Sequence, residues 1–212
     1  MNKFVIFDLD GTLIDTCEGI TKAVNNTLEH FNYPYHYSKE EIIKFLGHGA
    51  IYLYKKATKK DDMSDEEFNY FTVEYVKTQN ISSVYPFVKE TLEKLYKKGY
   101  KLMVYSNKPN GALQFLIREK LPSIRFLIVQ GNVPEYPAKP DPTLLNKILK
   151  DNKLDTIDGY YVGDSIVDLE TARNTNLKSV ILTYGYGDYE DIKAHNPDYM
   201  INSFDKLLDI LD

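Results

Sequence analysis

The chain has 212 residues, of which 43% are hydrophobic and 27% are charged, a composition typical of a globular protein with a sizeable buried core. The net charge is −5 and no block of Lys and Arg stands out, so a nucleic acid is not the expected partner. No apolar stretch reaches membrane-spanning length, and the single cysteine, Cys17, excludes an internal disulfide and fits a reducing cytoplasm.

The first predicted element is a strand at residues 4–7, where four apolar residues stand together. A short run that is apolar on both faces is typical of a central parallel strand buried between layers of helices. Asp8 ends the run, and Asp10-Gly11-Thr12 follows. Because ligands gather beyond the carboxyl ends of strands in open α/β sheets, chemistry is expected here, and two neighbouring carboxylates favour a cation such as Mg²⁺. Taken alone, the stretch also fits a strand that ends at a solvated Asp-Gly turn.

Residues of roughly 15–83 predict a block of helices without a strand. The expected helices are one over residues 20–31, one opened by a capping box at Ser38 and carrying apolar residues 42–46, one over 51–57 after Gly47-His48-Gly49, and one opened by a capping box at Ser64 and carrying apolar residues 68–75. The links near Thr16–Gly19 and Ser82–Phe87 are the expected hinges of this block.

From Val84 onward, strands and helices alternate. We expect a helix that starts near Val88 and ends at Gly99, strands at Lys101–Tyr105, Phe126–Val129, Tyr160–Val162, Val180–Leu182 and Met200-Ile201, and helices at Gly111–Lys120 and from an Asp141-Pro142 start. This alternation predicts an α/β fold with a doubly wound, Rossmann-like parallel sheet. The catalytic core would comprise residues 1–15 and 84–212, and residues 16–83 would form a helical cap above its carboxyl edge.

Polar residues follow the strands of this predicted sheet. They are Asp8 and Asp10, then Ser106, then Lys139, then Asp164 and Asp168. If they converge at one edge, the set holds a nucleophile, a second carboxylate, a hydroxyl, a lysine and a further acidic pair, which suits phosphoryl transfer. Each also has a structural explanation: a helix N-cap for Ser106, a solvated loop for Lys139, and a helix cap for Asp164.

With these motifs the sequence resembles the haloacid dehalogenase-like superfamily, in its helical-cap, phosphoglycolate phosphatase-like subclass. The four motifs are Asp8-Leu-Asp10-Gly-Thr12, Ser106-Asn107, Lys139-Pro140, and Gly163-Asp164-Ser165 through Asp168. They occur in the order of the family and cover nearly the whole chain. The resemblance implies that Asp8 attacks phosphorus and forms an aspartyl phosphate, while Asp10 protonates the leaving oxygen and then activates water.

The resemblance also implies a ligand set and a phosphate site. Mg²⁺ would be held by the Asp8 carboxylate, the Asp10 carbonyl, Asp164 and Asp168. Lys139 would stabilise Asp8 and the transferring oxygens. The residues expected to bind phosphate are Gly11, Thr12, Ser106, Asn107 and Lys139.

Two further stretches lie outside these four motifs. Gly47-His48-Gly49-Ala50 resembles the cap segment of phosphoglycolate phosphatase-like members, which implies that His48 faces the site and helps to select the substrate. The alternative is an exposed histidine in a turn between cap helices. The Tyr184–Tyr189 stretch predicts a loop near the site, without an assigned role.

We therefore expect a Mg²⁺-dependent phosphatase acting on a small phosphorylated metabolite, cytoplasmic, and a monomer or homodimer. A sugar phosphomutase that uses the same intermediate is the nearest alternative, and a non-catalytic regulatory protein on this fold is the second. A haloacid dehalogenase is disfavoured because Asp10 is present, and a phosphoacceptor signalling domain is disfavoured because of the inserted helices.

Overall fold

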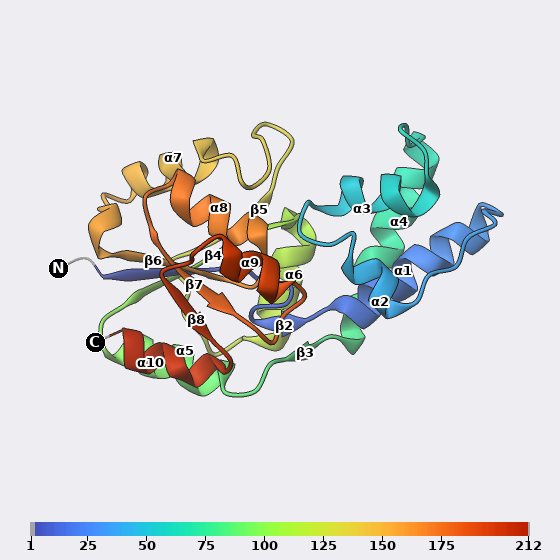
Figure 1. Ribbon diagram of the computed structural model, residues 1–212. Helices are drawn as coiled ribbons and strands as arrows, with labels where there is room; N and C mark the ends of the chain where they lie inside the picture. Colours follow the sequence, from blue (N-terminus) through green and yellow to red (C-terminus); the bar gives the residue numbers. More distant parts are fainter. Residues whose placement is uncertain (1–2, 212) are drawn as a thin grey trace.

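A six-stranded parallel sheet forms the centre of the larger part of the molecule, in the order β5-β4-β1-β6-β7-β8 (Figure 1). The computed structural model describes residues 3–211. The strands are β1 (Phe4–Phe7), β4 (Lys101–Pro109), β5 (Ile128–Asn132), β6 (Gly159–Gly163), β7 (Lys178–Leu182) and β8 (Tyr199–Ile201). Every neighbouring pair is parallel, which confirms the predicted α/β class.

Strand β1 lies in the middle of this sheet, and all four of its residues are fully buried. Val5 and Phe7 pack into one apolar cluster with helices α5 (Val88–Lys97), α6 (Asn110–Lys120) and α10 (Leu207–Ile210). Phe4 and Ile6 pack into a second cluster with α7 (Thr143–Asp151) and α8 (Ile166–Asn174). Successive side chains of a strand point to opposite faces, so helices cover both faces of the sheet and the unbroken apolar run is explained.

The remaining elements of the core are short. Helix α9 (Tyr189–Ala194) packs against α8 and β7 through Ile192, and 3-10 turns lie at Thr156–Asp158 and Phe204–Lys206. Gly99 follows the end of α5 with a φ of +89°, as predicted for the glycine after a helix. Within residues 3–211, no helix is both long and apolar enough to cross a membrane.

Four helices stand beside the sheet, at the right of Figure 1. They are α1 (Cys17–His30), α2 (Lys39–Ile43), α3 (Ala50–Thr58) and α4 (Asp65–Lys77), followed by a 3-10 turn at Thr78–Ile81. They share an apolar cluster of their own, to which the core contributes Ala112. The predicted capping boxes at Ser38 and Ser64 are both present. Helix α2 ends at Ile43, short of the predicted residue 46, because a turn leads into Gly47.

The prediction that residues 15–83 contain no strand is wrong. Strands β2 (Ile14–Asp15) and β3 (Ser83–Val84) pair antiparallel where the chain leaves and re-enters the core. Two-residue strands are too short for a hydrophobic period, so no sequence pattern reports them. We retain as a proposal the division into a core of 1–15 with 84–212 and a cap of 16–83; residues 1, 2 and 212 lie outside the described range.

Several other boundaries differ from prediction by a few residues. Strand β4 continues to Pro109, because Pro109 pairs with Asn132 after an irregularity in register. Strand β5 pairs from Ile128 rather than from Phe126. Helix α7 starts at Thr143, one residue later than an Asp141-Pro142 start implies. The Asp141 carboxylate accepts the Thr143 N–H, a turn contact that precedes the helix.

Candidate active site

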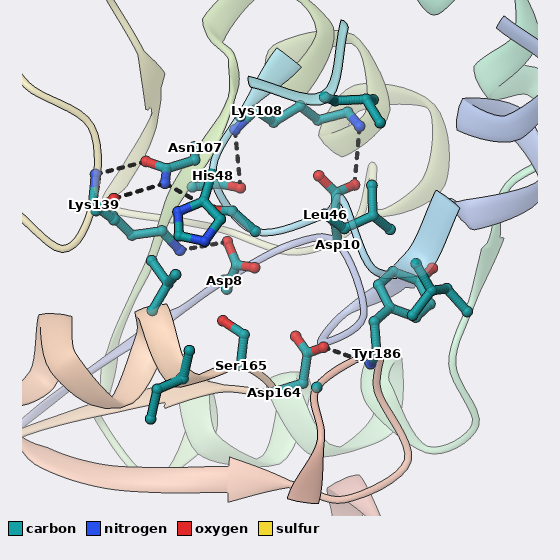
Figure 2. Close-up of a pocket in the computed structure, with 18 of the residues that line it drawn as sticks. Asp8, Asp10, Leu46, His48, Asn107, Lys108, Lys139, Asp164, Ser165 and Tyr186 are labelled. Carbon is teal, nitrogen blue, oxygen red and sulfur yellow. Dashed lines mark hydrogen bonds and ion pairs between the residues drawn. The ribbon is translucent and has the colours of Figure 1, made fainter. Parts of the chain in front are cut away.

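A cavity of about 310 Å³ opens at the carboxyl end of β1, between the sheet and the cap helices (Figure 2). The predicted site residues on its wall are Asp8, Asp10, His48, Ser106, Asn107, Lys139 and Asp164. Gly11, Thr12 and Asp168 are not on the wall and support it from behind. Parallel strands thus bring together side chains that are far apart in sequence, as predicted.

Lys139 neutralises two buried carboxylates at once. Its ammonium donates to Asp8 Oδ1 at 2.9 Å and to Asp168 Oδ1 at 2.8 Å, and its side chain is only 2% exposed. A third bond, of 2.9 Å, goes to the hydroxyl of Tyr161, which donates in turn to the Tyr105 carbonyl. Burial raises the pKa of Asp8 to about 6, although Lys139 opposes that rise.

Asp168 has both carboxylate oxygens occupied. One accepts from Lys139, and the other accepts from the N–H of Asp164, the N–H of Ser165 and the hydroxyl of Ser165. Ser165 and Asp168 form a capping box at the start of α8. Asp168 thus contacts both Lys139 and the turn that carries Asp164.

Asp164 is buried, and no Lys, Arg or His within residues 3–211 forms an ion pair with it. The Thr12 hydroxyl donates to Oδ1 at 2.8 Å, and the Tyr186 N–H donates to Oδ2 at 2.7 Å. A Cβ at Gly11 would lie 2.3 Å from Oδ2, and Gly11 has a φ of +80°, so only glycine fits there. Burial, followed by the charges of Asp168 and Asp8, raises the pKa of Asp164 well above its usual range.

This acidic cluster fits a hard cation. Carboxylate oxygens of Asp8, Asp164 and Asp168 all lie within 4.8 Å of one another, and all three residues are buried. Lys139 forms ion pairs with Asp8 and Asp168 but not with Asp164, so one buried carboxylate is left for a cation to neutralise. Oxygen ligands of this kind suit Mg²⁺.

Of the two carboxylate oxygens of Asp10, only Oδ1 accepts hydrogen bonds from residues 3–211. Its Oδ1 accepts from the Thr16 hydroxyl at 2.6 Å and from the Lys108 ammonium at 2.9 Å. Within residues 3–211 no group donates a hydrogen bond to Oδ2, which leaves this oxygen available to a ligand. The Lys108 ammonium also donates to the hydroxyl of Tyr75, a cap residue on α4, at 3.1 Å. Burial lowers the pKa of Lys108, but Asp10 and the Tyr75 hydroxyl together raise it above its usual value.

Asn107 joins three segments through its side-chain amide. The amide nitrogen donates to the carbonyls of Gly47 in the cap and Lys139 in the core, at 2.9 and 3.0 Å. The amide oxygen accepts the Lys139 N–H at 2.7 Å. The side chain therefore braces the wall of the cavity rather than offering a free group to a ligand, and Ser106 beside it is buried on the same wall.

His48 lies on the cap side of the cavity, and Figure 2 shows its ring above Asp8. The ring packs against Tyr52, with the two centroids 4.6 Å apart. The residue is also exposed to solvent. The structure therefore places His48 where the resemblance implies, and the role in selecting a substrate stays a prediction.

The roles of three contributors to the site were missed from the sequence. Lys108 is two residues after Ser106 on the extended β4, so the period of two residues in a strand is a signal that could have found it. Tyr161, on β6, carries no such signal, because its partners are distant in sequence. Tyr186 belongs to the Tyr184–Tyr189 stretch predicted as a loop near the site; the structure confirms its place on the cavity wall, and only its role was missed.

Comparisons with known proteins identify the family to which the chain belongs. The family described as haloacid dehalogenase-like hydrolase matches residues 5–182. A phosphoglycolate phosphatase of Vibrio parahaemolyticus is 31% identical to this chain, and the match covers 99% of this chain and 96% of the Vibrio protein. Another, of Haemophilus influenzae, is 33% identical over 99% and 98% of the two chains.

A solved structure of a related protein has the same fold. The crystal structure of a predicted phosphoglycolate phosphatase from Haemophilus somnus 129PT superposes with a TM-score of 0.85 at 30% identity, and it covers 99% of this chain and 98% of that one. The family model and the relatives that match nearly the whole chain carry the same conclusion as the four motifs and the fold. The chain belongs to the haloacid dehalogenase-like hydrolase family and is a phosphatase of that family.

Proposed function

We propose that the chain is a Mg²⁺-dependent phosphatase that hydrolyses a small phosphate monoester through an aspartyl phosphate on Asp8. The observation that carries this proposal is the setting of Asp8. It lies at the end of β1 on the cavity wall, with Lys139 bonded to one oxygen and Asp164 near enough to share a cation. Nucleophile, positive charge and metal ligand thus meet at one point.

The metal ligands proposed are the Asp8 carboxylate, the Asp10 main-chain carbonyl and Asp164. Mg²⁺ bound there would neutralise phosphate charge and polarise the phosphoryl oxygen. Asp168 was also predicted as a ligand, and its oxygen lies within the same 4.8 Å cluster. Because both of its oxygens already accept hydrogen bonds, we propose that its main contribution is to orient Lys139 and Asp164.

The reaction proposed uses two aspartates in two steps. An oxygen of Asp8 attacks phosphorus as the bond to the ester oxygen breaks, and Asp10 gives that oxygen a proton from Oδ2. Asp10 then accepts a proton from water as the water oxygen attacks phosphorus, which releases phosphate and restores Asp8. Lys139 holds Asp8 in place throughout, and Lys108 with Thr16 holds Asp10.

Phosphate contacts are proposed from Ser106, Lys139 and the main chain near Gly11 and Asn107. Thr12 was predicted to contact phosphate, but its hydroxyl donates to Asp164 and its side chain is fully buried. We propose instead that the Thr12 hydroxyl orients this metal ligand, as groups behind a metal site commonly do.

A substrate of the phosphoglycolate type is proposed for this site. The relatives named phosphoglycolate phosphatase support it, and so does a cavity of about 310 Å³, which suits a small ester. His48 would contact the part of the substrate distant from phosphorus. That the protein works in the cytoplasm as a monomer or homodimer stays a prediction.

The test is phosphate release from phosphoglycolate, other small phosphate esters and pyrophosphate, with and without Mg²⁺. We expect release that needs Mg²⁺ and is lost in Asp8→Asn, which keeps the size of the side chain but removes the nucleophile. No release from the intact protein, with Mg²⁺ shown to be bound, would contradict the proposal. Isomerisation of a sugar phosphate without net phosphate release would support the phosphomutase instead.

A further inference from the structure

Tyr186 lies in the loop between β7 and α9, in the tyrosine-rich stretch to which the motifs give no role. Its hydroxyl reaches the start of the cap helix α1. There it accepts the N–H groups of Thr16 at 2.7 Å and Cys17 at 3.0 Å, and it donates to Asp15 Oδ1 at 2.6 Å. Thr16 is the N-cap residue but makes no side-chain cap bond. The Tyr186 hydroxyl therefore serves as an acceptor at this helix start, together with Asp15 Oδ1, which accepts the Cys17 N–H at 3.3 Å.

The main chain of the same residue contacts the metal site. The Tyr186 N–H donates to Asp164 Oδ2 at 2.7 Å (Figure 2). Glycines on either side permit this approach: a Cβ at Gly185 would lie 2.3 Å from Asp164 Cβ, and one at Gly187 would lie 2.1 Å from the Asp164 carbonyl oxygen. The loop therefore lies directly on Asp164, and the position of one determines the position of the other.

Thr16 connects Tyr186 to Asp10, the proposed acid and base. Its N–H is held by Tyr186, and its hydroxyl donates to Asp10 Oδ1 at 2.6 Å. Asp15, the other partner of the Tyr186 hydroxyl, pairs through its second oxygen with Lys39 on cap helix α2 at 3.3 Å. A continuous set of hydrogen bonds thus runs from Asp164 through Tyr186 to Asp10 and to the cap.

We propose that Tyr186 is a positioning residue that links Asp164 to Asp10 and to the start of α1. The roles of Asp164 and Asp10 rest on the proposed function. A cation that fixes Asp164 also fixes the loop that bears on it, and the Tyr186 hydroxyl then holds the amides of Thr16 and Cys17 more firmly. Metal binding thereby orders the hinge of the cap and orients Asp10.

The test compares the intact chain with Tyr186→Phe, which removes the hydroxyl but keeps the ring and the N–H that contacts Asp164. Hydrogen exchange at the Thr16 and Cys17 amides is followed by NMR, with and without Mg²⁺, and Mg²⁺ affinity is measured by calorimetry. We expect Mg²⁺ to slow exchange about three- to tenfold in the intact chain, the effect of one strengthened hydrogen bond. In Tyr186→Phe this slowing is lost, while Mg²⁺ affinity stays within about threefold.

Tyr37→Phe is the matched control. It removes a phenol hydroxyl that donates to the Ala57 carbonyl at 2.9 Å within the cap, away from Asp164. A variant that merely loosens the cap should behave like this control and keep the Mg²⁺-dependent slowing. Retention of the slowing in Tyr186→Phe, or its absence from the intact chain with Mg²⁺ bound, overturns the link.

Kinetics give a second measure. We expect kcat to fall about three- to tenfold in both Tyr186→Phe and Thr16→Val, and the double variant to lose little more than either, because both act on Asp10 through the same bonds. Fully additive losses would overturn the shared route. Hydrogen exchange measured without Mg²⁺ distinguishes a failure of this inference from a failure of the proposed function. The exchange rates of the Thr16 and Cys17 amides should be higher in Tyr186→Phe than in the intact chain, even if no phosphate ester is hydrolysed.

Discussion

Replacement of Lys139 by methionine should destabilise the protein strongly. Met keeps most of the length of the side chain but removes the charge that lies 2.9 Å from Asp8 and 2.8 Å from Asp168. Loss of one partner from a buried ion pair costs about 3–5 kcal/mol. In a chain of this size each kcal/mol lowers Tm by about 2–4 °C, so we expect a fall of about 6–20 °C.

Calorimetry in EDTA at pH 7.5 measures this fall, with Lys147→Met as the matched control. Lys147 pairs with Asp151 on the surface, where both side chains are more than half exposed, and its replacement should change Tm by less than about 2 °C. Asp168→Asn added to Lys139→Met should restore part of the lost stability, because one uncompensated carboxylate is gone.

The pH dependence of the Lys139→Met effect follows from Asp8. Its pKa is about 6 in the folded protein and 3.8 for an ordinary aspartate, so the folded state binds more protons between these values. The contribution of Asp8 to stability therefore falls as pH rises through this window. Lys139 lowers the pKa of Asp8, so without Lys139 the folded variant keeps Asp8 protonated to a higher pH. Above about pH 6 the intact protein holds a compensated Asp8 charge that the variant cannot compensate, so the deficit of Lys139→Met should be smaller at pH 5 than at pH 7.5. A Tm within about 2 °C of the intact protein at pH 7.5, or a deficit that grows towards pH 5, would refute the reasoning.

Two further changes test other parts of the molecule. Gly11→Ala places a Cβ 2.3 Å from Asp164 Oδ2 at a φ of +80°, so Mg²⁺ affinity by calorimetry should fall at least about tenfold; unchanged affinity would contradict the close packing. Burial alone raises the pKa of Glu67, but hydrogen bonds from Tyr33 and Ser64 lower it to about 2. The stability lost in Glu67→Gln should therefore be full above about pH 4.5 and shrink towards pH 2, and a Tm difference independent of pH would contradict it.

The sequence by itself determined the fold class, the block of inserted helices and seven of the residues on the cavity wall. An apolar run at Phe4–Phe7 can be satisfied only where both faces are covered, which requires the parallel sheet seen here. Carboxyl ends of parallel strands meet at one edge, so Asp8, Asp10, Lys139 and Asp164 could be grouped before any contact was known. Capping boxes at Ser38 and Ser64 were readable because they are local.

Only the tertiary structure decided which side chains pair through hydrogen bonds and ion pairs around the site. Thr12 turns its hydroxyl to Asp164, 152 residues away, and Tyr186 bonds Thr16, 170 residues away. Lys108 meets Asp10 98 residues away, and β2 pairs with β3 through strands of two residues. No local pattern reports such pairs, because each depends on chain segments that become neighbours only when the sheet and the cap close around the same cavity.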